Sequence, residues 1–307
     1  MTAEQQPIEA RTVGGIRDTA LAVLLSLRPK QWTKNLIVFA ALIFDDHLFE
    51  PSRIALVVGA FICFCLASST VYLVNDLLDR ESDRLHPVKR NRPIASGRLN
   101  ERLAIITAVA LLLVSTLGAL ALRPGFAAII VLYLALLVAY SFMLKHVVIL
   151  DVFTIAGGFV LRAAGGAVVL DAPISPWLYV CTVLLALFLG FGKRRNELNV
   201  LEHAAGAHRR NLDEYTLPLL DQLILITSAA TVMAYSLYTF LAPNLPENHS
   251  MMLTIPVVLY GLFRYLYLLY VRGEGGAPEQ LLLTDRALLA TVAVWAAMAV
   301  AVLYGPL

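Results

Sequence analysis

The chain of 307 residues is 59% hydrophobic and only 15% charged, and its mean hydropathy is +0.74. Soluble domains are about 45–50% apolar and about 25% charged, so this composition excludes an ordinary soluble enzyme with a large core. The net charge of +2 points to no particular partner, and no nucleic-acid ligand is expected.

Nine apolar stretches are long enough to cross a bilayer, which takes about 20 residues. In chain order they cover residues 32–49, 53–78, 102–122, 125–143, 147–170, 175–197, 219–242, 251–271 and 284–305. Inside lipid each stretch must be a helix, because an open strand would leave its backbone hydrogen bonds unmade. The sequence therefore predicts an all-α integral membrane protein of nine transmembrane helices, in which residues 1–307 form a single transmembrane domain.

Lysine and arginine are distributed unevenly between the two sides of this predicted bundle. If the N-terminus is inside, the cytoplasmic segments and the basic end of the sixth span hold 20 of the 24 basic residues. The outer loops hold Arg53 and Arg123, and the spans hold Arg162 and Arg264. Because cytoplasmic loops are enriched in Lys and Arg, we expect a multi-pass protein of the plasma membrane with its N-terminus and active site in the cytoplasm and its C-terminus outside. The cytoplasmic segments then include residues 1–31 and the two long loops, 79–101 and 198–218.

The second span ends in a polar cluster with the pattern N-D-x-x-D-x-x-x-D, formed by Asn75, Asp76, Asp79 and Asp83. Successive residues of an α-helix are rotated by about 100°, so the four side chains fall within an arc of about 100°. Tyr72 lies one turn deeper on nearly the same face. Carboxylates this close repel one another unless a cation neutralises them. Oxygen ligands at this spacing suit Mg²⁺, which binds a few carboxylates together with substrate phosphates.

An alternative interpretation is a helix end solvated among lipid headgroups, with Arg80 and Arg84 pairing the acids. Three aspartates and an asparagine where a helix leaves the membrane are costly without a ligand. That cost favours the metal site.

The motif from Asn75 to Asp83 resembles the first aspartate-rich motif of the UbiA superfamily of intramembrane prenyltransferases, and the loop sequence N-R-P-I-A-S-G at 91–97 also matches that family. The resemblance implies nine helices around a central cavity that binds and ionises a Mg²⁺-diphosphate. It implies Asn75, Asp79 and Asp83 as metal ligands. It also implies a catalytic role for Asp76, Asp79 and Asp83, in which Asp76 orients the site or pairs with a cation. Mn²⁺ accepts the same hard oxygen ligands and could replace Mg²⁺.

A basic cluster occupies the place of the family's second D-x-x-x-D motif, after the sixth span. The chain reads Gly-Lys-Arg-Arg-Asn-Glu-Leu at 192–198, in which Glu197 is the one acid, and Leu201 stands four residues on. Three cations therefore replace the second acid pair. Lys193 and Arg194 are predicted to bind substrate phosphates. The alternative is positive-inside anchoring, with Lys193 and Glu197 paired along the helix.

Further basic side chains point to phosphate binding at the same end of the bundle. Lys30 and Lys34 are expected on one helical face before the first span. Tyr140 and Lys145 resemble the family's tyrosine–lysine pair, with one extra residue between them. Arg162 lies in the middle of a span among glycines, and it needs either an anion or, as the alternative, a buried carboxylate.

Together these features most resemble one branch of the superfamily, the phosphoribosyltransferases of actinobacterial cell-wall synthesis. The sequences R-P-K-Q-W-T-K-N at 28–35 and G-K-R-R-N-E-L at 192–198 carry this resemblance. It implies transfer of 5-phosphoribose from 5-phosphoribosyl 1-diphosphate to decaprenyl phosphate or another polyprenyl phosphate, with release of diphosphate. The substrate-binding residues expected for this reaction are Lys30, Lys34, Tyr72, Lys89, Arg92, Tyr140, Lys145, Arg162, Lys193, Arg194 and Glu197.

Two other functions remain open at this point. The first is ordinary prenyl transfer to an aromatic acceptor, against which the missing second acid motif counts. The second is a non-enzymatic transporter or lipid carrier. It is disfavoured because the polar residues gather at one membrane face and not at the midplane, where transporter sites usually lie. The sequence leaves a homo-oligomer open.

Overall fold

The computed structural model describes residues 15–44, 48–203, 214–243 and 245–305, and every regular element in these residues is a helix. With η denoting a 3₁₀-helix, the elements are α1 (Ile16–Ser26), η1 (Pro29–Phe39), α2 (Ala40–Ile43), α3 (Pro51–Leu78), α4 (Arg80–Leu85), η2 (Lys89–Asn91), α5 (Glu101–Leu122), α6 (Pro124–Phe142), η3 (Leu144–His146), α7 (Leu150–Leu170), α8 (Pro176–His203), α9 (Leu217–Leu241), η4 (Ser250–Thr254), α10 (Ile255–Tyr270), α11 (Pro278–Thr284) and α12 (Arg286–Tyr304). In the predicted loop 198–218, residues 198–203 extend α8 and residues 204–213 lie outside the described part of the chain.

Eight helices of the described residues are long and apolar enough to cross a membrane, and they confirm eight of the nine predicted spans. They are α3, α5, α6, α7, α8, α9, η4 together with α10, and α12. Proline occupies the first turn of several of them, including α3, α6 and α9. A proline is well tolerated there because the first turn leaves its N–H groups unbonded in any case.

The one predicted span not among these eight, residues 32–49 at the start of the bundle, has a different structure. Its described residues belong to the 3₁₀-helix η1 and the four-residue helix α2. A 3₁₀-helix rises about 2.0 Å per residue and an α-helix about 1.5 Å, so the two elements extend roughly 28 Å, close to the ~30 Å of a bilayer core. The stretched 3₁₀ geometry therefore lets a short segment cover most of the depth of the bundle.

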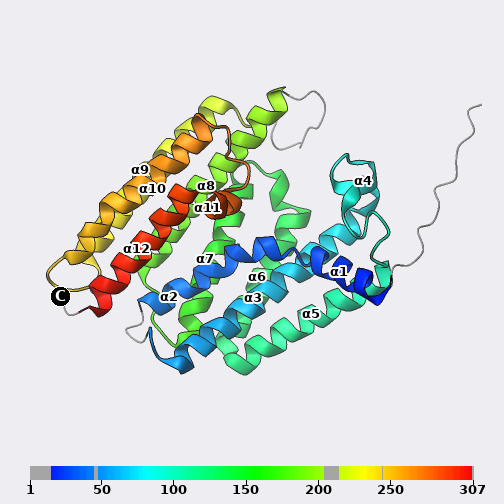
Figure 1. The fold of residues 1–307 in the computed structure, drawn as a ribbon, viewed down its shortest axis with the longest axis horizontal. Coiled ribbons are helices and arrows are strands. Elements are labelled where there is room, and N and C mark those ends of the chain that lie inside the picture. The colour runs from blue at the N-terminus through cyan, green and yellow to red at the C-terminus, as the bar shows by residue number, and fades with distance from the viewer. Residues whose placement is uncertain (1–14, 45–47, 204–213, 244, 306–307) are drawn as a thin grey trace, which may run out of the picture.

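The η1–α2 segment packs against α3 and α7 and crosses the bundle beside them (Figure 1). The backbones are close: a Cβ added to Gly166 of α7 would lie 2.1 Å from the carbonyl oxygen of Val38, and one added to Gly165 would lie 2.7 Å from the ring of Phe64. Small residues permit this approach of neighbouring segments in membrane proteins. The glycines of α7 therefore place η1 and α3 directly against it.

Helix α7 takes part in two apolar cores, one on each side of the bundle. One core joins η1, α3, α6 and α7 and contains Phe64 and Phe126. The other joins α7 to α8, α9 and α10 and contains Phe188 and Tyr265. In Figure 1, α5 and α3 lie on one side of the molecule and α9, α10 and α12 on the other. We call the end of the bundle at which α3 and α6 end and α7 begins the site end.

Candidate active site

The aspartate-rich motif lies at the site end, where α3 gives way to α4. Asp76 and Asp83 are buried and share one cation: Arg92 Nη1 lies 3.0 Å from Asp76 Oδ1 and 2.7 Å from Asp83 Oδ2. Arg28 Nη2 lies 2.5 Å from the same Asp76 oxygen. Two arginines of the chain itself therefore neutralise these two carboxylates.

Asn75 and Asp79 line a cleft of about 260 Å³ between the ends of α3 and α6. The other residues lining this cleft are Leu78, Ser141, Phe142, Lys145 and His146. Asp79 is exposed and Lys145 half-buried, and neither has an ion-pair partner among the described residues. The cleft therefore combines two oxygen donors with an unpaired lysine.

This donor set fits a metal ion that a substrate diphosphate helps to hold. In the part of the chain that is described, no three His, Cys, Asp or Glu side chains are grouped closely enough to bind a metal by themselves. Mg²⁺ needs fewer protein ligands, because it keeps several waters and shares phosphate oxygens. Asn75 and Asp79 supply two oxygens of the right kind, whereas Asp83 is engaged by Arg92.

Arg80 and Arg84 form their ion pairs with glutamates and not with the aspartates of the motif. Arg80 forms ion pairs with Glu81 and Glu101, and Arg84 forms one with Glu81. The alternative in which these two arginines neutralise the aspartate cluster is therefore wrong.

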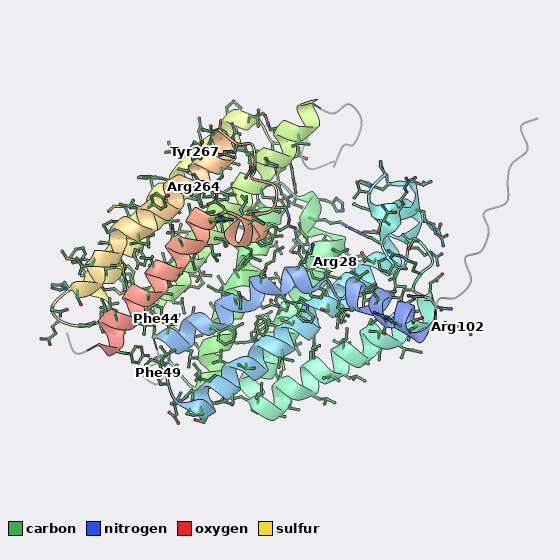
Figure 2. The ribbon with its side chains drawn as sticks, viewed as in Figure 1. Arg28, Phe44, Phe49, Arg102, Arg264 and Tyr267 are labelled. Carbon is green, nitrogen blue, oxygen red and sulfur yellow. The ribbon has the colours of Figure 1, made fainter. Side chains whose placement is uncertain are left out.

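Arg28 belongs to the site, although its sequence context gave no separate prediction for it. Its backbone is left-handed, with φ 54° and ψ 60°, a conformation that costs a non-glycine residue about 1–2 kcal/mol. Its guanidinium lies 4.8 Å from the ring centroid of Tyr72, and Figure 2 shows it near the junction of α1 and η1. Strain of this kind is typical of functional sites, and here it accompanies the contacts of Arg28 with Tyr72 and Asp76.

Lys30 and Lys34 do not share a face, contrary to the prediction. A 3₁₀-helix has 3.0 residues per turn, so residues four apart are rotated by about 120°. Lys30 is exposed, whereas Lys34 Nζ lies 3.2 Å from Oε1 of Glu279 on α11. The prediction assumed α-helical spacing in a segment that is a 3₁₀-helix.

Glu279 is a second site residue without a sequence prediction, and its side chain is 14% exposed. Burial alone would raise the pKa of Glu279, but Lys34, its own backbone N–H and Lys193 outweigh burial, so the pKa is lowered and the carboxylate is charged.

Arg194, predicted to bind phosphate, is instead part of a buried hydrogen-bonded network. Its Nε donates to Asp151 Oδ2 at 2.7 Å, Nη1 donates to Glu197, and Nη2 donates to the hydroxyl of Tyr140 at 3.3 Å. The hydroxyl of Tyr215 donates to Asp151 Oδ1 at 2.8 Å. The network joins α6, α7 and α8, and Arg194 is not among the residues that line the cleft.

The two neighbours of Arg194 have different surroundings. Lys193 Nζ lies 4.0 Å from Glu197 Oε1, one turn along α8, and its charge helps to lower the pKa of Glu279. Arg195 Nε lies 2.5 Å from Asp221 Oδ1, and its guanidinium lies 4.1 Å from the ring centroid of Tyr270. Of the three cations of the basic cluster, Lys193 is therefore the one whose charge acts on Glu279.

Arg162 is buried within α7, and none of the described carboxylates pairs with it. Its Nε donates to Asn35 Oδ1 and its Nη2 to the hydroxyl of Tyr133, both at 2.6 Å. The rings of Tyr133 and Phe159 flank its guanidinium at 4.8 and 5.1 Å. The alternative in which a buried acid neutralises Arg162 is therefore wrong within the described residues, and its partners are neutral.

The remaining predicted residues differ in their surroundings. Lys89 is exposed in η2 and has no ion pair in the described ranges. Tyr140 and Glu197 serve as partners of Arg194, and Glu197 is also near Lys193.

Asp151 could have been found from sequence, because a charge inside a predicted span is costly and usually has a role.

Comparison with known proteins gives a consistent result. A model of the UbiA prenyltransferase family matches residues 36–282. The chain is 35% identical to a decaprenyl-phosphate phosphoribosyltransferase of Mycobacterium tuberculosis, over 92% of this chain and 95% of that protein. It is 34% identical to the enzyme of the same name from Corynebacterium glutamicum, over 91% of this chain and 86% of that protein.

Solved structures of similar fold are also found. A UbiA homolog from Archaeoglobus fulgidus bound to DMAPP and Mg²⁺ has a TM-score of 0.70 at 20% identity, over 92% of this chain and 99% of that chain. A digeranylgeranylglyceryl phosphate synthase has a TM-score of 0.66 at 15% identity, over 93% of this chain and 99% of that chain. These likenesses concern the fold, and they confirm the predicted all-α membrane architecture.

Proposed function

This chain belongs to the UbiA prenyltransferase family, and we propose that it transfers 5-phosphoribose from 5-phosphoribosyl 1-diphosphate to a polyprenyl phosphate such as decaprenyl phosphate. The observation that carries the proposal is uncompensated positive charge. Lys145 and Arg162 have no carboxylate partner in the described part of the chain, and the one acid at the second motif position, Glu197, is engaged by Arg194. Such charge suits a donor with a diphosphate and a 5-phosphate, and an acceptor that is itself a phosphate.

In this proposal the cleft at the end of α3 binds the donor diphosphate. Asn75 and Asp79 would hold Mg²⁺ or Mn²⁺ there, and the metal when bound would neutralise charge on the leaving diphosphate. Lys145 contacts the same diphosphate from η3. Asp76 and Asp83 act as positioning residues, because they fix the guanidinium of Arg92 at the edge of the site.

The reaction forms a bond between an acceptor phosphate oxygen and ribose C1, and it breaks the bond from C1 to the diphosphate oxygen. The attacking oxygen is already ionised, so positioning and charge neutralisation dominate over base catalysis. We assign the acceptor phosphate to Arg162, because that residue is buried within a membrane-spanning helix. Lys34 and Lys193 are assigned to the donor, because they lie beside the loop that carries α11.

The proposed site lies at the cytoplasmic face of the plasma membrane. The whole chain forms one transmembrane domain in this proposal. The concentration of Lys and Arg at this end supports that orientation, as does the water solubility of the donor. The lipid tail of the acceptor would lie against the apolar, lipid-facing helices.

A transfer assay with two donor classes tests the proposal. Purified protein in lipid vesicles is incubated with Mg²⁺, radiolabelled 5-phosphoribosyl 1-diphosphate and decaprenyl phosphate, and the organic phase is counted. A parallel reaction contains a labelled prenyl diphosphate and an aromatic acid. Label in the lipid product of the first reaction alone is expected. Product from the second reaction alone would contradict the proposal and favour ordinary prenyl transfer.

A further inference from the structure

The backbone at Ile149, between η3 and α7, forms a strained turn. Ile149 has φ 69° and ψ −47°, and the N–H of Leu150 donates to the carbonyl oxygen of Val148 at 2.8 Å. These values describe a γ-turn whose central residue has positive φ, which is the rare and strained form. A β-branched residue at positive φ is a steric outlier, whereas a glycine would adopt this conformation readily. Such a turn persists only where the surrounding structure holds it.

The hydroxyl of Tyr215 holds this turn from outside it. The N–H of Ile149 donates to Tyr215 Oη at 2.7 Å, and the Tyr215 hydroxyl donates to Asp151 Oδ1 at 2.8 Å. Tyr215 is 3% exposed and lies just before α9. Burial and the hydrogen bond to Asp151 raise the pKa of this hydroxyl, so it is protonated and can donate. The side chain of Tyr215 therefore ties the strained peptide to the network formed by Asp151 and Arg194.

The turn at Ile149 sets the direction in which the chain passes from η3 into α7. Backbone hydrogen bonds connect the two elements: the N–H of Val147 donates to the carbonyl oxygen of Leu144, and the N–H of Asp151 donates to that of Val147. Lys145 lies on η3, four residues before Ile149, and lines the cleft at the end of α3. A change in the turn would therefore displace Lys145.

We propose that Tyr215 is a positioning residue for the transfer reaction, because its hydroxyl holds the turn at Ile149 and so keeps Lys145 in the cleft. This inference rests on the proposed function, in which Lys145 contacts the diphosphate of the donor. Tyr215 is not among the residues that line the cleft, so it acts on the substrate through η3. Misplacement of a contact group by about 1 Å can lower a rate by about a hundredfold, so a small shift of η3 is enough.

The alternative is that Tyr215 only fastens the start of α9 to α7. Other contacts already do so. Helix α8 packs against both of them, and Leu220 of α9 shares an apolar core with Val152 of α7. The start of α9 has its own cap, because the N–H of Leu219 donates to Thr216 Oγ1 at 3.3 Å. A fastening role also gives no reason for a strained residue at the other end of the hydrogen bond.

The test measures the binding of inorganic diphosphate with Mg²⁺ to the full chain in lipid nanodiscs, by isothermal titration calorimetry. A phosphoribosyl donor and a prenyl diphosphate both carry this group, so the measurement is independent of which donor the enzyme uses. Tyr215→Phe should weaken binding by about tenfold, and kcat/KM for 5-phosphoribosyl 1-diphosphate should fall in parallel. In a Lys145→Met background the same change should cost less than about twofold, because the lysine that it positions is gone.

Substitutions of Ile149 separate positioning from fastening. Ile149→Gly relieves the strain, so it should restore diphosphate binding in Tyr215→Phe to within about threefold of wild type. Ile149→Ala is the matched control, because it keeps a Cβ and with it a penalty at positive φ, and it should restore much less.

Tyr235→Phe controls for the loss of a buried tyrosine hydroxyl elsewhere. Tyr235 Oη lies 2.6 Å from Thr254 Oγ1, and Tyr235 is about five turns along α9 from its start at Leu217. This variant should lower the unfolding midpoint and leave diphosphate binding unchanged.

Three results would overturn the inference. They are unchanged diphosphate binding in a folded Tyr215→Phe protein, an equal loss with and without Lys145, and equal binding after the glycine and alanine substitutions of Ile149. Thermal unfolding shows which variants fold. If Tyr215→Phe does not fold, the double variant with Ile149→Gly decides: binding within about threefold of wild type supports the inference, and weaker binding or failure to fold overturns it.

Failure of the proposed function has a different signature. A wild type that binds diphosphate but transfers no phosphoribose would overturn the proposed function, while the same binding data would still decide the role of Tyr215. A wild type that binds no diphosphate would overturn both.

Discussion

Arg194 and Asp151 form a buried ion pair in which Arg194 Nε lies 2.7 Å from Asp151 Oδ2, and their side chains are 2% and 0% exposed. The pair joins α8 to α7 near the site end. A cation that the sequence predicts to bind a substrate phosphate thus holds two helices together.

Arg194→Met should lower the free energy of unfolding by about 3–5 kcal/mol, because it leaves the buried carboxylate of Asp151 without its cation. The fall is measured as a lower midpoint of thermal unfolding in detergent. Arg195→Met is the matched control: its partner Asp221 is 40% exposed, so a loss below about 1 kcal/mol is expected. A stable Arg194→Met protein with a raised KM for the donor would contradict this prediction and show that Arg194 binds the substrate.

Asp79→Asn and Asp83→Asn should have different effects. Asp79 is exposed at the cleft, so its replacement should reduce transfer by about hundredfold or more, as expected for the loss of a metal ligand, while the unfolding midpoint stays nearly constant. The buried carboxylate of Asp83 pairs with the partly exposed Arg92, so its replacement should lower both activity and stability. Parallel stability losses in the two variants would show that Asp79 also has a structural role.

Removing divalent metal should abolish transfer without unfolding the protein. The reason is that Asn75 and Asp79 supply few ligands and the substrate supplies the rest. Activity is measured in excess chelator and again after addition of Mg²⁺ or Mn²⁺, with circular dichroism as the check on folding. Full activity in excess chelator would contradict the proposal that the site uses a divalent metal.

Arg162→Gln should reduce transfer by about tenfold to hundredfold through weaker binding of the acceptor phosphate. The unfolding midpoint should stay constant or rise, because the change removes a buried charge that has only neutral partners in the described structure. Arg264→Gln is the control. Arg264 lies on α10, pairs with Asp285 and is far from Arg28 (Figure 2). A destabilised Arg162→Gln protein with normal KM values would show that Arg162 is structural.

The ion pair between Lys34 and Glu279 predicts a pH dependence of stability. Although burial opposes it, Lys34 lowers the pKa of Glu279 below the ordinary 4.5. The pair therefore contributes stability that is fully present above about pH 4.5 and is lost as the pH falls through the lower pKa of the folded protein. The unfolding midpoint, measured from neutral pH downward, should fall less steeply in Lys34→Met than in wild type. Identical pH profiles would show that the pair contributes nothing.

Much of the fold follows from the sequence because membrane helices have a simple composition. Eight long apolar stretches became helices, and three of the predicted site residues, Asn75, Asp79 and Lys145, line one cleft. The geometry of η1 did not follow, because hydropathy reports the length of an apolar run and not the number of residues per turn. That difference separated Lys30 from Lys34.

The partners of the charged residues could not be read from the sequence. Arg194 meets Asp151 across 43 positions, and Lys34 meets Glu279 through the packing of a short loop helix against η1. A cluster of adjacent cations looks like one site in sequence, but successive residues of a helix point in different directions. Lys193, Arg194 and Arg195 accordingly have three separate surroundings.

The most direct test of the account follows each part of the donor through the reaction. One preparation of 5-phosphoribosyl 1-diphosphate is labelled in a ribose carbon and another in the β-phosphorus, and each is incubated with vesicles containing the protein, Mg²⁺ and decaprenyl phosphate. The account predicts that the ribose label enters the organic phase while the β-phosphorus label stays in water as diphosphate. Retention of both labels in the aqueous phase, with a prenyl diphosphate consumed instead when an aromatic acid is supplied, would contradict it.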